Sequence, residues 1–272
     1  MNFSKITNKG IVRKNNEDYI FATNKKINKL DNLFIVCDGV GGNACGEVAS
    51  KNSIKSFVKC LKQNEIVSML DSGRVKTIFQ YGISFAEKTL RDISSKKEKT
   101  KGMCTTFVCA TICNNKLYVT NIGDSRLYLI SQSKKQDGEN IVYDRVIDQI
   151  TVDNAQIIEQ RVVPKDVALD INCDSLQSIN TINRKYLTKS LGYTPNVVGD
   201  FYEVDLSKKI ENKNEIYILM CTDGLYGNIT NENIKNILFN NKFKLKDKTK
   251  HLVKMALDAG GNDNISAILI EV

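Results

Sequence analysis

The sequence predicts an α+β fold, because patterns of helical period and of strand period occupy separate stretches of the chain. Two amphipathic helical patterns follow one another after Gly42, with apolar residues at 54, 57, 58 and 61 and then at 75, 78, 79, 86, 90 and 93. Strand-like runs come next, and one further helix and strand end the chain. We therefore expect a single domain, residues 1–272, in which paired helices cover a sheet.

Aspartates stand at the ends of the most apolar strand-like runs. Three runs show this arrangement: residues 33–37 before Asp38, residues 216–221 before Thr222 and Asp223, and residues 265–270 after Asp263. If these strands are neighbours, the three carboxylates converge, and they repel one another unless a cation lies between them. Oxygen ligands favour Mg²⁺ or Mn²⁺. One Asp-Gly pair after a strand is ordinarily a turn, whereas three in this pattern indicate a metal site.

The middle of the chain predicts two hairpins. Residues 105–112 and 116–121 flank a tight Asn-Asn turn. The polar stretch 131–140 is expected to be the loop of a second hairpin that leads into residues 141–151. Gly123-Asp124 lies between the two hairpins and links two strands. An ordinary turn explains this Gly-Asp pair unless other acidic residues lie beside Asp124.

The last third of the chain is less regular at first. Periodicity fades over residues 153–184, and we expect either a flap over the active site or a plain surface excursion. Residues 187–192 predict a short helical turn, and residues 201–206 predict an edge strand. Asp247 is expected to cap the last helix, which buries Leu252, Val253, Ala256 and Leu257 and ends at Gly260.

The residue types also limit the chemistry. The single histidine, His251, lies among lysines on a predicted helix surface, so catalysis by a serine or cysteine with a histidine base lacks its base. Arg13 precedes the acids Glu17 and Asp18. Arginine suits bidentate binding of a phosphate, but an arginine close to two acids is, by itself, usually a surface ion-pair cluster. A mechanism built on carboxylates and metal ions is what remains.

Composition favours an intracellular protein. The formal net charge is +8, but the lysines are scattered without interleaved aromatic residues, which favours a solvated surface over a nucleic-acid groove. No apolar run is long enough to span a bilayer, and the N-terminal stretch is polar without a signal core. Cys37, Cys109 and Cys221 lie inside apolar runs and indicate buried thiols in a reducing, cytoplasmic compartment.

The ordered motifs resemble one known family. They are Arg13 with Asn16-Glu17-Asp18, Asp38-Gly39-Val40-Gly41-Gly42, Thr105-Thr106, Gly123-Asp124-Ser125-Arg126, Thr222-Asp223-Gly224 and Asp263-Asn264. Each motif alone is weak, but six in this order resemble the metal-dependent protein phosphatases of type 2C in their compact, bacterial-like form. The resemblance covers essentially the whole chain. It implies a four-layer α-β-β-α sandwich, in which two antiparallel sheets are flanked by helices.

The resemblance also implies a role for each site residue. Asp38 bridges two ions of Mn²⁺ or Mg²⁺, the Gly39 carbonyl joins one of them, and Asp223 and Asp263 hold the other. Asp124, together with Asp223, corresponds to a weaker third position. Arg13 matches the phosphate-binding arginine, and Glu17 and Asp18 match acids that act through metal-bound water.

By this resemblance, a hydroxide that bridges the metals attacks phosphorus in line and releases serine or threonine. The expected partners are phosphorylated proteins of a serine/threonine kinase, and we expect a monomer that binds neither nucleic acid nor membrane. Two alternatives stay open. One is a catalytically silent scaffold that binds phosphoproteins, and the other is a basic nucleic-acid-binding domain.

Three positions depart from the pattern. Val40 stands where the animal members carry a histidine that is thought to protonate the leaving group. Cys104 replaces a glycine that usually precedes the Thr-Thr pair, and Asn154 stands where a histidine is common. The last two affect the expected local geometry and the placement of the flap, but no expected metal ligand is missing.

Overall fold

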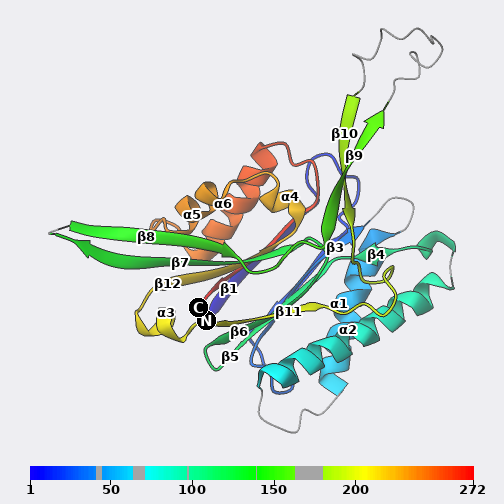
Figure 1. Ribbon diagram of the computed structural model, residues 1–272, viewed down its shortest axis with the longest axis horizontal. Helices are drawn as coiled ribbons and strands as arrows, with labels where there is room; N and C mark the ends of the chain where they lie inside the picture. The colour runs from blue at the N-terminus through cyan, green and yellow to red at the C-terminus, as the bar shows by residue number, and fades with distance from the viewer. Residues whose placement is uncertain (41–44, 64–70, 97, 139, 163–179) are drawn as a thin grey trace.

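Two antiparallel sheets form the centre of the protein (Figure 1). The structure, a computed structural model, describes residues 1–40, 45–63, 71–96, 98–138, 140–162 and 180–272. One sheet has the order β1 (Asn2–Asn8), β13 (Ile265–Glu271), β12 (Glu215–Cys221), β7 (Arg126–Asp137) and β8 (Asn140–Gln149). The other has the order β11 (Asp200–Asp205), β6 (Lys116–Ile122), β5 (Phe107–Cys113), β3 (Leu33–Val40) and β2 (Asp18–Thr23), and β4 (Cys104–Thr105) pairs with β3.

Helices cover the outer face of each sheet. The long helices α1 (Gly46–Gln63) and α2 (Ser72–Ser94) pack on the sheet that contains β3, and α4 (Asp223–Tyr226), α5 (Asn231–Leu238) and α6 (Leu245–Asp258) pack on the sheet that contains β12. The short helices η1 (Glu98–Thr100) and α3 (Ser207–Glu211) lie in connections. The predicted four-layer sandwich is confirmed. No helix in the described ranges is both long and apolar enough to cross a lipid bilayer.

Three apolar layers hold the sandwich together. The middle layer joins the inner faces of the two sheets, with Phe34 and Val36 from β3 opposite Ile218 and Met220 from β12. The alternate side chains of the same strands face the helices, so β3 contributes Ile35 to the outer layer. Because strands buried on both faces lose the alternation of polar and apolar residues, β3, β12 and β13 read as continuous apolar runs in the sequence.

A two-stranded hairpin projects from the body of the molecule (Figure 1). We call the hairpin of β9 (Ala155–Val162) and β10 (Asn180–Leu187) the arm. The arm includes part of the stretch 153–184, in which the sequence shows no hydrophobic periodicity. Residues 163–179 of that stretch lie outside the described residues. Among the strands that the structure describes, β9 and β10 pair only with each other, and Ile157 is 71% exposed. A strand without a buried face gives no alternating pattern, which explains why the sequence does not indicate it.

Three local predictions are wrong. The expected loop at residues 131–140 is mostly strand, because β7 continues to Asp137 and pairs with β8 beyond the body of the sheet, where residues 134–137 of β7 are polar and exposed. Residues 187–192 form no helical turn; Leu191 instead bridges to Thr105. Asp247 lies within the first turn of α6, and Lys244 holds the cap position without a side-chain hydrogen bond.

Other local predictions are confirmed. The hairpin of β5 and β6 turns through Asn114 and Asn115, which both have positive φ. β11 is an edge strand. The thiols of Cys37, Cys109 and Cys221 are buried and free.

Candidate active site

One polar pocket of about 360 Å³ collects the predicted site residues. Its lining includes every one of them except Asp18: Arg13, Glu17, Asp38, Gly39, Asp124, Asp223 and Asp263. They come from the end of β3, the loop before β2, the turn between β6 and β7, the start of α4 and the loop before β13. Segments more than 200 residues apart in sequence therefore meet at one end of the sandwich.

The Thr-Thr pair fixes the backbone of Asp38. The Asp38 N–H donates to Thr106 Oγ1 over 2.8 Å, and the Thr106 N–H donates to the Asp38 carbonyl over 2.8 Å. The Thr105 hydroxyl also donates to that carbonyl. Thr106 Oγ1 lies 2.7 Å from Ser125 Oγ, which ties the end of β3 to the turn that carries Asp124. These contacts orient the Asp38 carboxylate toward the pocket without using its own oxygens.

Two glycines allow α1 to start against the site. A Cβ on Gly39 would lie 2.2 Å from the Gly46 carbonyl oxygen, and a Cβ on Gly46 would lie 2.7 Å from the Gly39 carbonyl oxygen. Only glycine permits this approach of two backbones. The Glu17 carboxylate accepts a hydrogen bond from the Gly46 N–H at the start of α1, while burial and then the nearby Glu47 raise the pKa of Glu17.

Asn264 holds the loop that presents Arg13 and Glu17. Its side-chain amide donates to the carbonyls of Lys9 and Asn15 over 2.7 and 2.9 Å, and its side-chain oxygen accepts from the Glu17 N–H over 2.8 Å. Arg13 Nη2 then forms an ion pair with Asp263 Oδ2 over 2.8 Å. The Arg13 side chain is 51% exposed, so it stands at the mouth of the pocket.

Asp18 lies behind the pocket wall. It is 5% exposed, and its Oδ2 accepts a hydrogen bond from the Thr222 hydroxyl over 2.9 Å. Burial, opposed in part by hydrogen bonds from Ser266 and Thr222, raises the pKa of Asp18 to about 7. Asp18 pairs in register with Asp38 on the neighbouring strand. It can therefore act on a ligand of the pocket only through the groups in front of it.

The acids of the pocket destabilise one another. Burial and then the negative charges of Asp18 and Asp223 raise the pKa of Asp38 well above its ordinary value. Burial and the charges of Asp124 and Asp263 likewise raise the pKa of Asp223. Such shifts favour any cation that can enter and neutralise the carboxylates.

The donor set fits a hard divalent cation. Asp223 Oδ1 and Asp18 Oδ1 are buried without a hydrogen-bond partner in the described part of the structure. Carboxylate and carbonyl oxygens are the ligands that Mg²⁺ and Mn²⁺ prefer. Among the described residues, no three acidic, thiol or imidazole groups surround a common point closely enough to encircle an ion.

Two protein cations partly neutralise the site. Arg13 pairs with Asp263, and Lys185 of the arm forms an ion pair with Asp124. Lys185 Nζ also donates to Tyr226 Oη over 2.9 Å, and the Tyr226 hydroxyl donates to the Asp124 carbonyl oxygen over 2.9 Å. Sequence reasoning missed both Lys185 and Tyr226. No local pattern indicates them, because their role depends on where the arm leaves the body.

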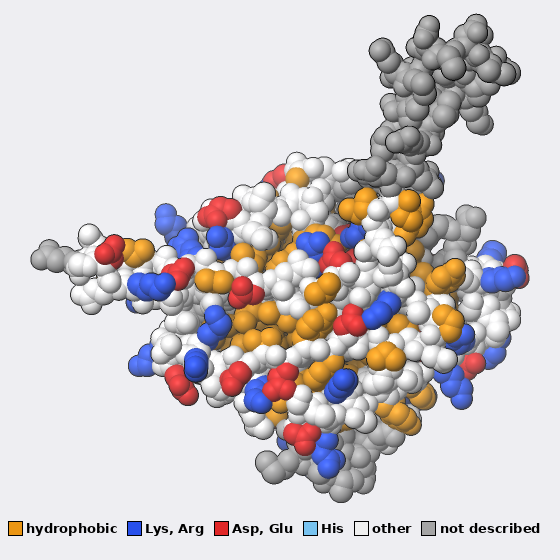
Figure 2. Space-filling model, in the orientation of Figure 1, with side chains coloured by type: hydrophobic (Ala, Val, Ile, Leu, Met, Phe, Trp, Pro, Cys, Tyr) orange, Lys and Arg blue, Asp and Glu red, His pale blue; other side chains and the backbone are white. Residues whose placement is uncertain are grey.

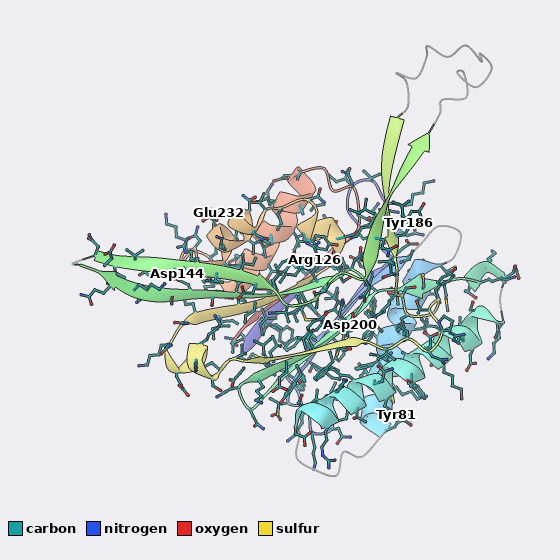
Figure 3. All side chains as sticks on the ribbon, in the orientation of Figure 1. Tyr81, Arg126, Asp144, Tyr186, Asp200 and Glu232 are labelled. Carbon is teal, nitrogen blue, oxygen red and sulfur yellow. The ribbon has the colours of Figure 1, made fainter. Side chains whose placement is uncertain are left out.

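A second set of contacts fixes the base of the arm. The Arg126 guanidinium makes a bidentate ion pair with Asp153, with Nη2 to Oδ2 at 2.8 Å, and lies 3.7 Å from the centre of the Tyr226 ring. Figure 3 shows Arg126 and Tyr186 near the point where the arm joins the sheets. Asn154 exchanges hydrogen bonds with the Gly123 backbone, so this departure from the family pattern anchors the turn that carries Asp124.

The other two departures lie close to the pocket. Val40 lines it, and its side chain supplies no proton donor. Cys104 is partly buried beside Ser190, and burial raises the pKa of its thiol. His251 is exposed, with its ring stacked on Phe243, and does not line the pocket.

Comparison with known proteins places these features in context. The sequence profile of the family described as protein phosphatase 2C matches residues 4–149. A putative protein phosphatase of Mycoplasma genitalium is 30% identical over 99% of this chain and 95% of that protein. The solved serine/threonine phosphatase of Staphylococcus aureus superposes with a TM-score of 0.72 at 24% identity, over 99% of this chain and 94% of that one. A second solved structure, the catalytic domain of a serine/threonine protein phosphatase in complex with two manganese ions, gives a TM-score of 0.64 at 22% identity, over 98% and 96% of the two chains.

Proposed function

The chain belongs to the protein phosphatase 2C family and is a protein serine/threonine phosphatase, and we propose that the pocket around Asp38 is where it hydrolyses phosphoserine and phosphothreonine. The observation that carries this proposal is the convergence of Asp38, Asp223 and Asp263, with shifted pKa values, on a pocket that also holds Arg13.

Divalent cations are the proposed cofactors. We expect Asp38, the Gly39 carbonyl, Asp223 and Asp263 to hold two ions of Mn²⁺ or Mg²⁺, and Asp124 to contribute to a weaker third position. When bound, such ions supply a nucleophile from water near neutral pH and neutralise charge on the phosphoryl group. The manganese complex of the related phosphatase supports this choice.

The side chains of the pocket orient the substrate. Arg13 is half exposed and already holds a carboxylate, so it can exchange Asp263 for a phosphoryl oxygen when a phosphorylated residue enters. Glu17 and Asp18 act by orienting water, because Glu17 lines the pocket and Asp18 stands behind its wall. Val40 cannot protonate the departing alkoxide, so a water molecule would have to supply that proton.

The proposed setting is that of a cytoplasmic monomer that reverses the action of a serine/threonine kinase and binds neither nucleic acid nor membrane. On the face shown in Figure 2, basic and acidic side chains are interspersed and do not separate by sign. This arrangement supports a protein substrate over a nucleic-acid ligand on that face. The arm is a candidate flap, since Lys185 and Leu187 at its base line the pocket.

A kinetic experiment tests the proposal. We expect a phosphothreonine peptide to release phosphate with added Mn²⁺, and an Asp223→Asn variant to lose at least 100-fold of that rate, an order-of-magnitude expectation for losing one ligand of a catalytic metal. Arg13→Ala should act mainly on KM. Equal turnover by the wild type and the Asp223→Asn variant would refute the assignment. Bound peptide without phosphate release would instead indicate a catalytically silent scaffold.

A further inference from the structure

A second, larger cavity lies away from the catalytic pocket. It measures about 750 Å³ and runs between β1 and the start of α6. Residues 2–6 form one side, residues 243–246 form the other, and Lys248, Lys250 and Glu271 complete the lining. We call this cavity the basic groove. None of its lining residues belongs to the catalytic pocket.

The basic groove follows the open edge of a sheet. Five consecutive residues of β1 line it, although alternate side chains of a strand point to opposite faces. A cavity that meets all five must therefore run along the strand edge. β1 is the last strand of its sheet and pairs only with β13, and residues 2–8 make no further backbone hydrogen bond within the described chain. The outer N–H and C=O groups of β1 are available to an added strand.

The rim of the basic groove carries unpaired positive charge. Lys5, Lys244 and Lys246 are exposed and form no ion pair with any described residue. Lys250 has only a long contact of 3.7 Å with Asp247. Glu271 is the one carboxylate of the lining. The 14-residue helix α6 also starts here without a side-chain cap, so the positive end of its dipole adds to the positive electrostatic potential of the groove.

Lys248 is a nearly buried cation whose direct hydrogen-bond partner is neutral. Its side chain belongs to the lining, the residue is only 5% exposed, and its Nζ donates to Tyr217 Oη over 2.7 Å. An ammonium group has three donors, and no described carboxylate lies within ion-pair distance of this one. Burial lowers the pKa of Lys248, and the more distant carboxylates of Glu215 and Glu271 oppose that shift. Because Glu215 and Glu271 act on this ammonium only from beyond ion-pair distance, an anion that enters the groove would stabilise it further.

The inner surface of the basic groove is apolar. Phe3, Ile6, Phe243 and Leu245 are half-buried and line it beneath the lysines. An extended chain places alternate side chains on opposite sides. A segment that alternates acidic and apolar residues would therefore satisfy the lysine rim and the apolar floor at the same time.

We propose that the basic groove binds an extended acidic segment of a partner protein, which adds as a strand to the free edge of β1. Backbone pairing with β1 supplies affinity, and the lysines select for acidic side chains. The inference does not depend on the phosphatase activity.

Charge-reversal variants test the proposal with a fluorescein-labelled decapeptide of alternating glutamate and valine as the probe. Fluorescence anisotropy at about 50 mM salt should show binding to the wild type and a loss of at least tenfold in affinity for the Lys244→Glu/Lys246→Glu variant. The matched control is Lys51→Glu/Lys55→Glu, which makes the same change in charge on the exposed face of α1. The control should bind within about twofold of the wild type, because surface charges more than a Debye length away are screened.

Two further measurements separate the groove from general effects. Hydrogen exchange should slow at the amides of β1 when the peptide binds, and hydrolysis of p-nitrophenyl phosphate should be the same in both variants and the wild type. Equal losses of peptide affinity in the two variants would overturn the proposal. Unchanged exchange in β1, or preferential binding of single-stranded RNA that is abolished by Lys244→Glu/Lys246→Glu, would also overturn it.

Discussion

Replacing Lys185 by alanine should strengthen metal binding at Asp124. In the wild type, the Lys185 ammonium forms an ion pair with the Asp124 carboxylate and is held there by Tyr226. A cation that is to use Asp124 must displace this ammonium or share the carboxylate with it. Removing the lysine therefore removes a competitor and leaves the carboxylate in place.

The size of the effect follows from the charges. Two unit charges about 4 Å apart interact by about 4 kcal/mol at an effective dielectric constant of about 20. The Lys185 side chain is 36% exposed, so solvent screens the pair and the ammonium regains hydration when displaced. We expect about 1–2 kcal/mol to remain, which corresponds to roughly 5- to 30-fold tighter binding of the weakest ion.

Titration with Mn²⁺, followed by the electron paramagnetic resonance signal of the free ion, measures this affinity without reference to activity. Lys189→Ala is the matched control, because Lys189 is 37% exposed and pairs with Asp200, which does not line the pocket. Asp124→Asn should abolish the weakest site. The reasoning fails if Lys185→Ala and Lys189→Ala shift the affinity by the same amount.

Three other predictions concern stability and substrate binding. Mn²⁺ at 100 times its dissociation constant should stabilise the fold by about 2.7 kcal/mol and raise the melting temperature by about 5 °C. The same melting temperature in Mn²⁺ and in chelator would contradict metal binding. Asn264→Ala breaks three hydrogen bonds to the loop that carries Arg13. The free energy of unfolding measured in urea should therefore fall by about 2–4 kcal/mol, and KM for a phosphopeptide should rise. An unchanged KM would mean that the loop is held by other contacts. Arg126→Lys should cost about 1–3 kcal/mol because a lysine cannot make the bidentate pair. Lys135→Ala breaks an exposed ion pair and should leave the unfolding curve unchanged. Similar losses in the two unfolding curves would argue against a structural role for Arg126.

The convergence of the site acids could be predicted because it depends on strand ends. β12 and β13 are antiparallel neighbours, so the end of one and the start of the other lie together, and Asp223 meets Asp263. Each run was apolar enough to be recognised as a strand, and the acid beside it marked the end. Local sequence therefore indicated the strands and their ends, whereas it did not indicate that β3, which lies in the other sheet, ends beside them.

The contacts of the arm could not be predicted from local sequence. Ile157 is exposed, and none of the side chains described in its strand, at residues 155–158, is buried to impose an alternating pattern. Lys185 lies on the same hairpin and reaches Asp124 across 61 positions of sequence. The same reason explains the error at residues 131–140, where residues 134–137 of β7 pair with β8 beyond the body of the sheet and are polar and exposed on both faces.

The pairing of β1 with β13 has a practical use. Asn2 stands opposite Glu271 in the register, and Figure 1 shows the two ends of the chain side by side. A short glycine-rich bridge between them would make a circular chain, which could be reopened at the turn through Asn114 and Asn115 to give a permutant with the same sheets. In that permutant β1 and β13 become a covalent hairpin, and new sequence could be fused on the opposite sheet without obstructing the edge of β1.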